Sequence, residues 1–283
     1  MRALVMARFT FREALRKRIL YAALGLTFVF YLLFWTGCYF AFQEMRQGHM
    51  PASITRYAAA QILLSGLYVV NFMAGLLAIF TAAGTIANEV EQGTLHAVVP
   101  KSLHRWEIVL GKWLGFALML SLYAVISSAV AIAVVYVLSG YLPPSPVQAV
   151  ALSVLGVMLL LSLTILGSTV LPTIATGVVV FMLYALGTAG GMVEQLGNLI
   201  RNATMINIGI ITSLVIPSDV IWKMAAYLLQ PPAVLDALGN LSNRTTGPFT
   251  VATAPSQAMI VYSILYTATA LGLSLLLFQR KDL

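Results

Sequence analysis

Charged side chains are scarce in this chain. Asp, Glu, Lys and Arg make up only 9% of its 283 residues, whereas 60% of the residues are hydrophobic. A soluble domain carries roughly 25% charged residues, so this chain has too few of them to cover a water-facing surface. We therefore expect a lipid bilayer to be its main solvent.

Several kinds of reactive site are also missing from the sequence. A single cysteine, Cys38, excludes an internal disulfide framework and an all-cysteine metal site. The sequence has no phosphate-binding Gly-x-x-x-x-Gly-Lys-Ser/Thr loop and no His-Glu-x-x-His zinc motif. We expect no catalytic residue, cofactor site or metal site in the chain, and therefore no enzymatic activity of its own.

Six charge-free runs are long enough to cross a bilayer as helices, at about 1.5 Å per residue. They cover residues 19–42, 57–87, 113–138, 147–171, 174–192 and 259–278, with boundaries good to a few residues. No Asp, Glu, His, Lys or Arg lies in the middle of these runs, which argues against an intramembrane proton relay. The predicted fold is an all-α polytopic membrane protein with one six-helix transmembrane domain over residues 19–283.

The distribution of basic residues predicts the orientation of these spans. If the N-terminus is cytoplasmic, eleven of the sixteen Lys and Arg residues lie on the cytoplasmic side: Arg2, Arg8, Arg12, Arg16, Lys17, Arg18, Lys101, Arg105, Lys112, Arg280 and Lys281. The positive-inside rule then favours both termini in the cytoplasm. The net charge of +7 is explained by this topology, and we expect no nucleic acid partner.

Residues 1–18 precede the first span and form a separate basic segment. Leu4, Ala7, Phe11, Ala14 and Leu15 fall on one face of a helical wheel. The segment predicts a helix lying in the cytoplasmic membrane interface, with basic side chains near anionic lipid headgroups; these are Arg12, Arg16, Lys17 and Arg18. The alternative is a positively charged flank without a defined helix.

Residues 193–258 form the longest segment outside the spans. The apolar run 206–216 is too short to cross and predicts a re-entrant or interfacial element. Ser218 or Asp219 could cap a following helix over 220–229. In the second span, Gln61 and Asn71 could line a pathway, or they could satisfy each other or a backbone group at a dimer interface.

A polar segment at residues 88–112 joins the second and third spans. Glu89 and Glu91 lie at the water boundary, Thr94 can cap a short helix over 95–99, and Pro100 ends it. The result would be a short crosswise helix attached to two rigid spans, on which a soluble partner could push. Taken alone, the two glutamates could equally be a solvated membrane flank.

Residues 86–95 (Ile-Ala-Asn-Glu-Val-Glu-Gln-Gly-Thr-Leu) and 100–112 (Pro-Lys-Ser-Leu-His-Arg-Trp-Glu-Ile-Val-Leu-Gly-Lys) resemble the signature of ABC-2 type transporter permeases. The basic start and the C-terminal Phe-Gln-Arg-Lys-Asp-Leu at 278–283 are similar to the same family. Residues 217–222 (Pro-Ser-Asp-Val-Ile-Trp) resemble a segment of permeases related to copper-enzyme maturation systems.

The resemblance implies a type V exporter-like fold in which two permeases pair as a homodimer or close heterodimer. It also implies two copies of a separate ABC ATPase subunit, which would hold ATP and Mg²⁺. The residues expected to couple this chain to the ATPase are Glu89, Glu91, Gly93, Thr94, Leu95, Pro100, Arg105 and Lys112. An outer gate is expected between the last two spans, at Pro217, Asp219 and Trp222.

The sequence therefore predicts the permease subunit of an ATP-driven transporter, an exporter in the inner or plasma membrane of a bacterium or archaeon. The alternative is a membrane scaffold or receptor that binds a periplasmic partner through residues 193–258 without ATP-driven transport.

Overall fold

The computed structural model describes residues 2–48, 51–87, 105–231, 251 and 255–280, and this part of the chain contains helices and no strand. The helices, in chain order, are α1 (Arg2–Arg16), α2 (Arg18–Gln47), α3 (Ala52–Ala82), α6 (Arg105–Ser139), α7 (Pro146–Val170), α8 (Thr173–Ile200), α9 (Ala203–Val215), α10 (Ser218–Leu229) and α12 (Ala258–Gln279). The all-α prediction is confirmed.

Six of these helices are long and apolar enough to cross a membrane, as predicted: α2, α3, α6, α7, α8 and α12. Some extend well beyond the charge-free runs. The helix α6 begins at Arg105 instead of residue 113, and α8 continues to Ile200 instead of residue 192. Charged residues such as Glu107 and Glu194 do not end a helix, so the length of a charge-free run underestimates the length of the helix.

Glycine and proline set the breaks between these helices. Gly140 follows the third span and has a φ of +70°, a conformation that favours glycine. Pro146 lies in the first turn of α7, and Pro172 immediately precedes α8, positions where the missing N–H costs nothing. The turn at 140–146 and the break at Leu171–Thr173 therefore lie at the boundaries between the predicted spans 113–138, 147–171 and 174–192.

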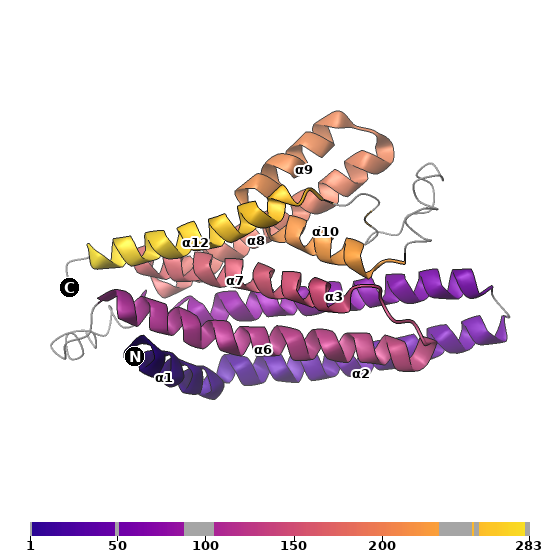
Figure 1. Cartoon of the computed structure of the whole chain (residues 1–283), viewed down its shortest axis with the longest axis horizontal. Helices are drawn as coiled ribbons and strands as arrows, with labels where there is room; N and C mark the ends of the chain where they lie inside the picture. The colour runs from indigo at the N-terminus through magenta and orange to yellow at the C-terminus, as the bar shows by residue number, and fades with distance from the viewer. Residues whose placement is uncertain (1, 49–50, 88–104, 232–250, 252–254, 281–283) are drawn as a thin grey trace.

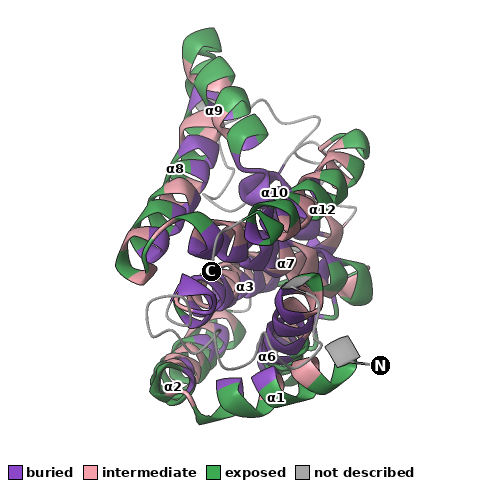
Figure 2. Ribbon diagram, turned by 90° about the vertical axis from the view of Figure 1, so that its left-hand side faces the viewer, coloured by how far each residue is buried: buried purple, intermediate pink, exposed green. Residues whose placement is uncertain are grey.

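The long helices run lengthwise beside one another, and the α8–α9 hairpin stands away from them (Figure 1). Both described chain ends, the end of α3 and the start of α6 lie at the same end of the molecule, which we call the loop end. The core lies among α3, α6, α7 and α10 (Figure 2). The helices α2 and α12 are largely exposed, with apolar side chains such as Phe28, Leu33 and Leu265 facing outward, as expected for lipid contact.

The segment between α8 and α12 forms a bent helix pair. The axes of α9 and α10 differ by 105°, and neither helix alone is long enough to cross a membrane. Asn202 caps α9 by accepting hydrogen bonds from the backbone N–H of Thr204 and Met205. The expected cap of the next helix is wrong: Ser218 and Asp219 lie inside the first turn of α10, Pro217 is the capping residue, and no side chain bonds there.

The N-terminal segment is a helix, α1, which packs across α6. Met6, Ala7, Thr10, Phe11 and Ala14 are its buried and half-buried residues. Leu4 and Leu15, expected on the same apolar face, are 68% and 41% exposed. Ala7, Phe11 and Ala14 of the expected apolar face therefore pack against the protein, whereas Leu4 and Leu15 remain accessible.

Candidate functional site

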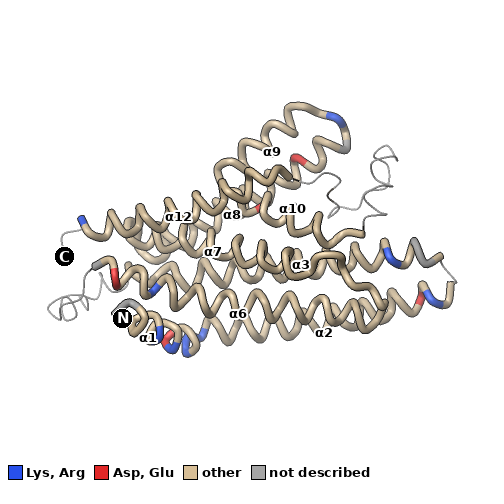
Figure 3. Tube along the Cα trace, in the orientation of Figure 1, with Lys and Arg blue, Asp and Glu red and all other residues tan. Residues whose placement is uncertain are grey.

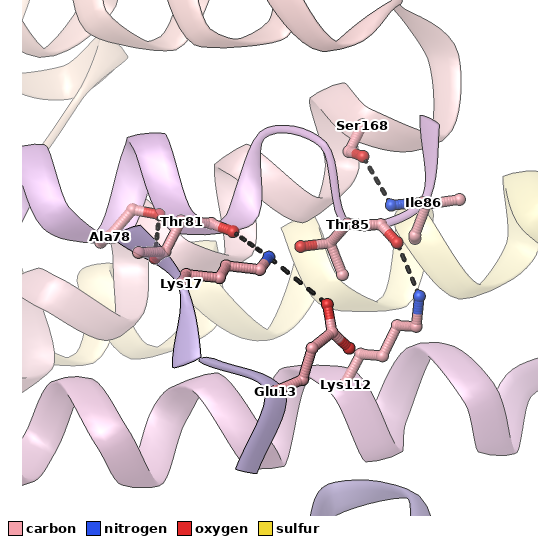
Figure 4. A network of polar contacts seen from close by, with 8 residues as sticks. All are labelled: Glu13, Lys17, Ala78, Thr81, Thr85, Ile86, Lys112 and Ser168. Carbon is pink, nitrogen blue, oxygen red and sulfur yellow. Dashed lines mark hydrogen bonds and ion pairs between the residues drawn. The ribbon is translucent and has the colours of Figure 1, made fainter. Parts of the chain in front are cut away.

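Two lysines at the loop end donate to backbone carbonyls where α3 ends. The Nζ of Lys17, from the junction of α1 and α2, lies 3.1 Å from the carbonyl oxygen of Thr81. The Nζ of Lys112, from α6, lies 2.6 Å from that of Thr85 (Figure 4). Thr81 is in the last turn of α3, where carbonyls lack intrahelical donors and carry partial negative charge, so a cation stabilises it. Thr85 lies in the turn that follows α3.

The chain leaving α3 is held by a third contact, from α7. The Oγ of Ser168 accepts hydrogen bonds from the backbone N–H groups of Ile86 and Ala87, at 3.0 and 3.1 Å. Ser168 and both of these residues are buried. Residues 81–87 are therefore fixed to three other parts of the bundle immediately before the segment at 88–104 begins.

The position of Lys17 depends on the packing of α1 against α6. At Gly115 of α6, an added Cβ would lie 2.7 Å from the Ala7 carbonyl oxygen and 2.7 Å from the Thr10 Cβ, closer than real side chains approach. Lys17 also lies 4.9 Å from the centre of the Phe116 ring, within range of a cation–π contact. We call residues Lys17, Thr81, Thr85, Lys112 and Ser168 the α3 anchor.

Most of the residues predicted to couple the chain to an ATPase lie outside the described residues: Glu89, Glu91, Gly93, Thr94, Leu95 and Pro100. Arg105 is the first residue of α6. Lys112 is only 3% exposed, and its ammonium group points inward to the α3 anchor. Lys112 is thus placed to position α3 and does not lie on an accessible surface.

The other basic residues at the loop end lie mainly on α1 (Figure 3). Arg12, Arg16 and Arg18 are exposed, whereas Lys17 is half-buried. Glu13 lies 3.8 Å from the Lys17 Nζ. The arginines predicted to face lipid headgroups are accessible, and Lys17 differs from them because it belongs to the α3 anchor.

A second group of charged residues lies within the bent pair and its neighbour. The Lys223 Nζ of α10 is 2.7 Å from a carboxylate oxygen of Glu194 on α8 and 2.8 Å from one of Asp219. The side chains of Lys223 and Asp219 are 9% and 7% exposed, and that of Glu194 is 24% exposed. We call these three residues the charged triad.

Glycines allow the triad and the bent pair to lie directly against α8. A Cβ at Gly191 would collide with the Asp219 carboxylate, and one at Gly187 would touch Ser218 and Ile216. The small-xxx-small spacing of these two glycines is typical of close helix contacts, and the partner here is the junction of α9 and α10.

Tyrosines from α12 and from the turn between α6 and α7 donate to backbone carbonyls at the ends of α9 and α10. The hydroxyls of Tyr262 and Tyr266, on α12, lie 2.6 and 3.0 Å from the carbonyl oxygens of Leu214 and Val215. The Tyr141 hydroxyl lies 2.7 Å from the carbonyl oxygen of Leu229. Burial raises the pKa of Tyr141 to about 12, so its hydroxyl is protonated and donates at neutral pH.

The predicted gate residues meet the core at the start of α10. Trp222 is buried, with its ring edge-on to Tyr68 at 5.5 Å between centres. Pro217 is buried at the bend, and Asp219 belongs to the triad. Gln61 and Asn71 are both half-buried on α3; about 15 Å of helix separates them, so they do not bond each other within one chain.

The sequence profile described as ABC-2 family transporter protein matches residues 4–283 of this chain. The chain belongs to the ABC-2 transporter family. No relative is found among curated proteins. An ABC-2 permease is the membrane component of an ABC transporter, and its association with an ABC ATPase follows from the family.

In this ABC-2 permease, sequence reasoning missed six of the eight residues of the two sites. Thr81, Thr85 and Ser168 were assigned no role. Lys17 was assigned to lipid contact, and Glu194 and Lys223 were assigned no role. A signal for the triad was present, because Asp219 and Lys223 are four residues apart, the spacing of helical ion pairs. The link between Lys223 and Glu194 had no such signal, because these residues lie on different helices and are 29 positions apart in the sequence.

Proposed function

We propose that this permease is the membrane subunit of an ABC exporter, driven by a separate ATPase that docks on residues 88–112. The observation that carries the coupling proposal is the α3 anchor. It holds the end of α3 to α1, α6 and α7 immediately before the proposed docking segment. A push on that segment would therefore act on several helices together.

The proposed orientation places the loop end in the cytoplasm. The basic residues of α1, of the start of α6 and of the end of α12 lie toward this end, whereas those near the end of α2 and the start of α3 lie toward the other (Figure 3). The positive-inside rule supports this assignment. We place the protein in the inner or plasma membrane of a bacterium or archaeon, with α1 in the cytoplasmic membrane interface.

The proposed assembly has two permeases and two ATPase subunits. The permeases form a homodimer or close heterodimer, and the ATPase subunits bind ATP and Mg²⁺. This chain contributes no hydrolytic step. Its contribution is mechanical, because the anchored end of α3 transfers movement of the docking segment to the core.

The proposed outer gate is the bent pair, α9 and α10, with Pro217, Asp219 and Trp222 at its centre. The pair lies between the last two spans, and it reaches the core through Trp222 and Tyr68. Movement of α3, which carries Tyr68, would therefore act on α10 directly. Movement of the docking segment at the loop end would in this way open the gate formed by α9 and α10.

The test is to reverse the charge of the docking segment in the purified complex. Glu89→Lys together with Glu91→Lys should abolish stimulation of ATP hydrolysis by the permease while leaving membrane insertion unchanged. Glu44→Lys is the matched control, because Glu44 is exposed near the opposite end of α2. Stimulation that survives the double reversal would reject the coupling proposal.

The alternative of a scaffold or receptor without ATP-driven transport is less well supported. The family profile includes residues 193–258, so this segment needs no separate role as a receptor surface. Purification of the tagged chain separates the two proposals. Co-elution of a nucleotide-binding protein supports the transporter, and its consistent absence would favour the scaffold.

A further inference from the structure

Glu194 contacts both limbs of the bent pair. Its Cβ lies against Gly209 of α9, where an added Cβ would collide with it. Its carboxylate reaches the Lys223 ammonium of α10 at 2.7 Å. One side chain of α8 therefore touches α9 with its stem and α10 with its charged group.

The angle between α9 and α10 depends on how each helix packs against its neighbours. The two helices contact each other little, and α9 packs mainly on α8. The end of α9 is tied to α12 through Tyr262 and Tyr266, which fixes the position of the bend. Ser218 and Asp219 of α10 also lie against α8, at Gly187 and Gly191. The Glu194–Lys223 ion pair adds a charged contact from the residue of α8 that touches α9 as well.

The strength of this contact follows from its surroundings. Lys223 is buried between two carboxylates, and the Asp219 carboxylate lies against the α8 backbone at Gly191. An ion pair removed from water attracts far more strongly than an exposed one, and removal of one partner leaves the other buried and uncompensated. Glu194 is the most exposed of the three, so water can solvate its carboxylate most readily when it separates from Lys223.

We propose that the Glu194–Lys223 ion pair fixes the angle between α9 and α10, with Lys223 as a positioning residue, and that this pair breaks when the gate opens. The breaking of the ion pair rests on the proposed function, whereas its role in setting the angle concerns the fold alone. In the closed arrangement Lys223 holds both acidic partners. In the open arrangement it keeps Asp219, four residues away on the same helix, and releases Glu194.

The experiment measures the distance between spin labels on α9 and α10 in the full-length permease, in lipid nanodiscs, with and without its co-purified ATPase. Labels are attached at Thr204→Cys and Leu228→Cys in a Cys38→Ala background. Thr204 lies about 16 Å along the helix from the end of α9, so a 15° change at the bend moves it by about 4 Å. Pulsed electron spin resonance resolves such a change.

With the native triad we expect one narrow distance distribution. Glu194→Gln should add a second population displaced by several ångströms, and the Glu44→Gln control should leave the distribution unchanged. An unchanged distribution in a well-folded Glu194→Gln protein would overturn the proposal. If that variant does not fold, Asp219→Asn with Lys223→Met removes the pair without leaving a fully buried charge, and the same displacement is expected.

The same samples separate this proposal from the proposed function. A displaced population with unaltered ATP hydrolysis would support the role of the ion pair in the fold and contradict its role in the gate. Altered hydrolysis with an unchanged distance would reject the role of the ion pair in setting the angle. Both changes together are the expected result.

Discussion

Replacing Lys112 with methionine removes one cation from the α3 anchor and keeps most of its hydrophobic stem. Lys112 is 3% exposed, and its Nζ lies 2.6 Å from the Thr85 carbonyl oxygen. A hydrogen bond to a charged group contributes about 1.5–3 kcal/mol, and a buried polar group left unsatisfied costs about 1–3 kcal/mol. Burial of the ammonium itself is unfavourable by several kcal/mol, and the variant removes that cost too.

The carbonyl left without this donor decides the sign of the effect. The stem of methionine fills nearly the same volume, so no large cavity forms. We expect Lys112→Met to lower the free energy of unfolding by about 2 kcal/mol, which reduces the ratio of folded to unfolded protein about thirty-fold. Since the end of α3 loses one of its fixed points, stimulation of the ATPase should fall as well.

The assay is unfolding by sodium dodecyl sulfate in mixed micelles, followed by circular dichroism, beside ATP hydrolysis by the complex. Arg18→Met is the matched control, because it removes a basic residue that is exposed at the same end of the bundle. Equal unfolding midpoints for Lys112→Met and Arg18→Met would refute the reasoning.

Three further substitutions test the packing around both sites by the same unfolding assay. Gly115→Ala should destabilise the protein, because its Cβ would lie about 0.7 Å closer to α1 than ordinary contact allows and α1 must move away. Gly25→Ala, where the added Cβ has no neighbour, should not destabilise it. Equal effects of the two substitutions would contradict the packing of α1 on α6. Ser168→Ala should cost about 1–3 kcal/mol because two buried N–H groups lose their acceptor, and Ser153→Ala on the same helix should cost less. Tyr141→Phe should cost about 1 kcal/mol by leaving the end of α10 without its donor; no loss would mean that another group satisfies that carbonyl.

The bundle could be predicted from the sequence because its spans depend on local composition. Each span is a long run without charge, and proline or glycine marks the turns, as at Gly140 and Pro172. The predicted start of α6 was too late and the predicted end of α8 too early, because charged residues were used as the boundaries. Helices continue past charged residues wherever their backbone hydrogen bonds are satisfied.

The two sites could be predicted only in part, because their contacts join residues far apart in the sequence. The motif near Lys112 indicated a functional region, but its bond to Thr85 depends on how α3 and α6 pack. Lys17 looked like the neighbouring arginines, and only the approach of α1 at Gly115 separates it from them. Glu194 was placed outside a span that in fact includes it.

The most direct test of the account is the sidedness of the segment between α3 and α6. A cysteine introduced by Glu91→Cys in a Cys38→Ala background is exposed to a membrane-impermeant thiol reagent, first in intact cells and then after permeabilisation. The account predicts labelling only after permeabilisation, since the docking segment must face the compartment that holds the ATPase. Labelling in intact cells would place that segment outside and contradict the proposal that an ATPase drives this permease.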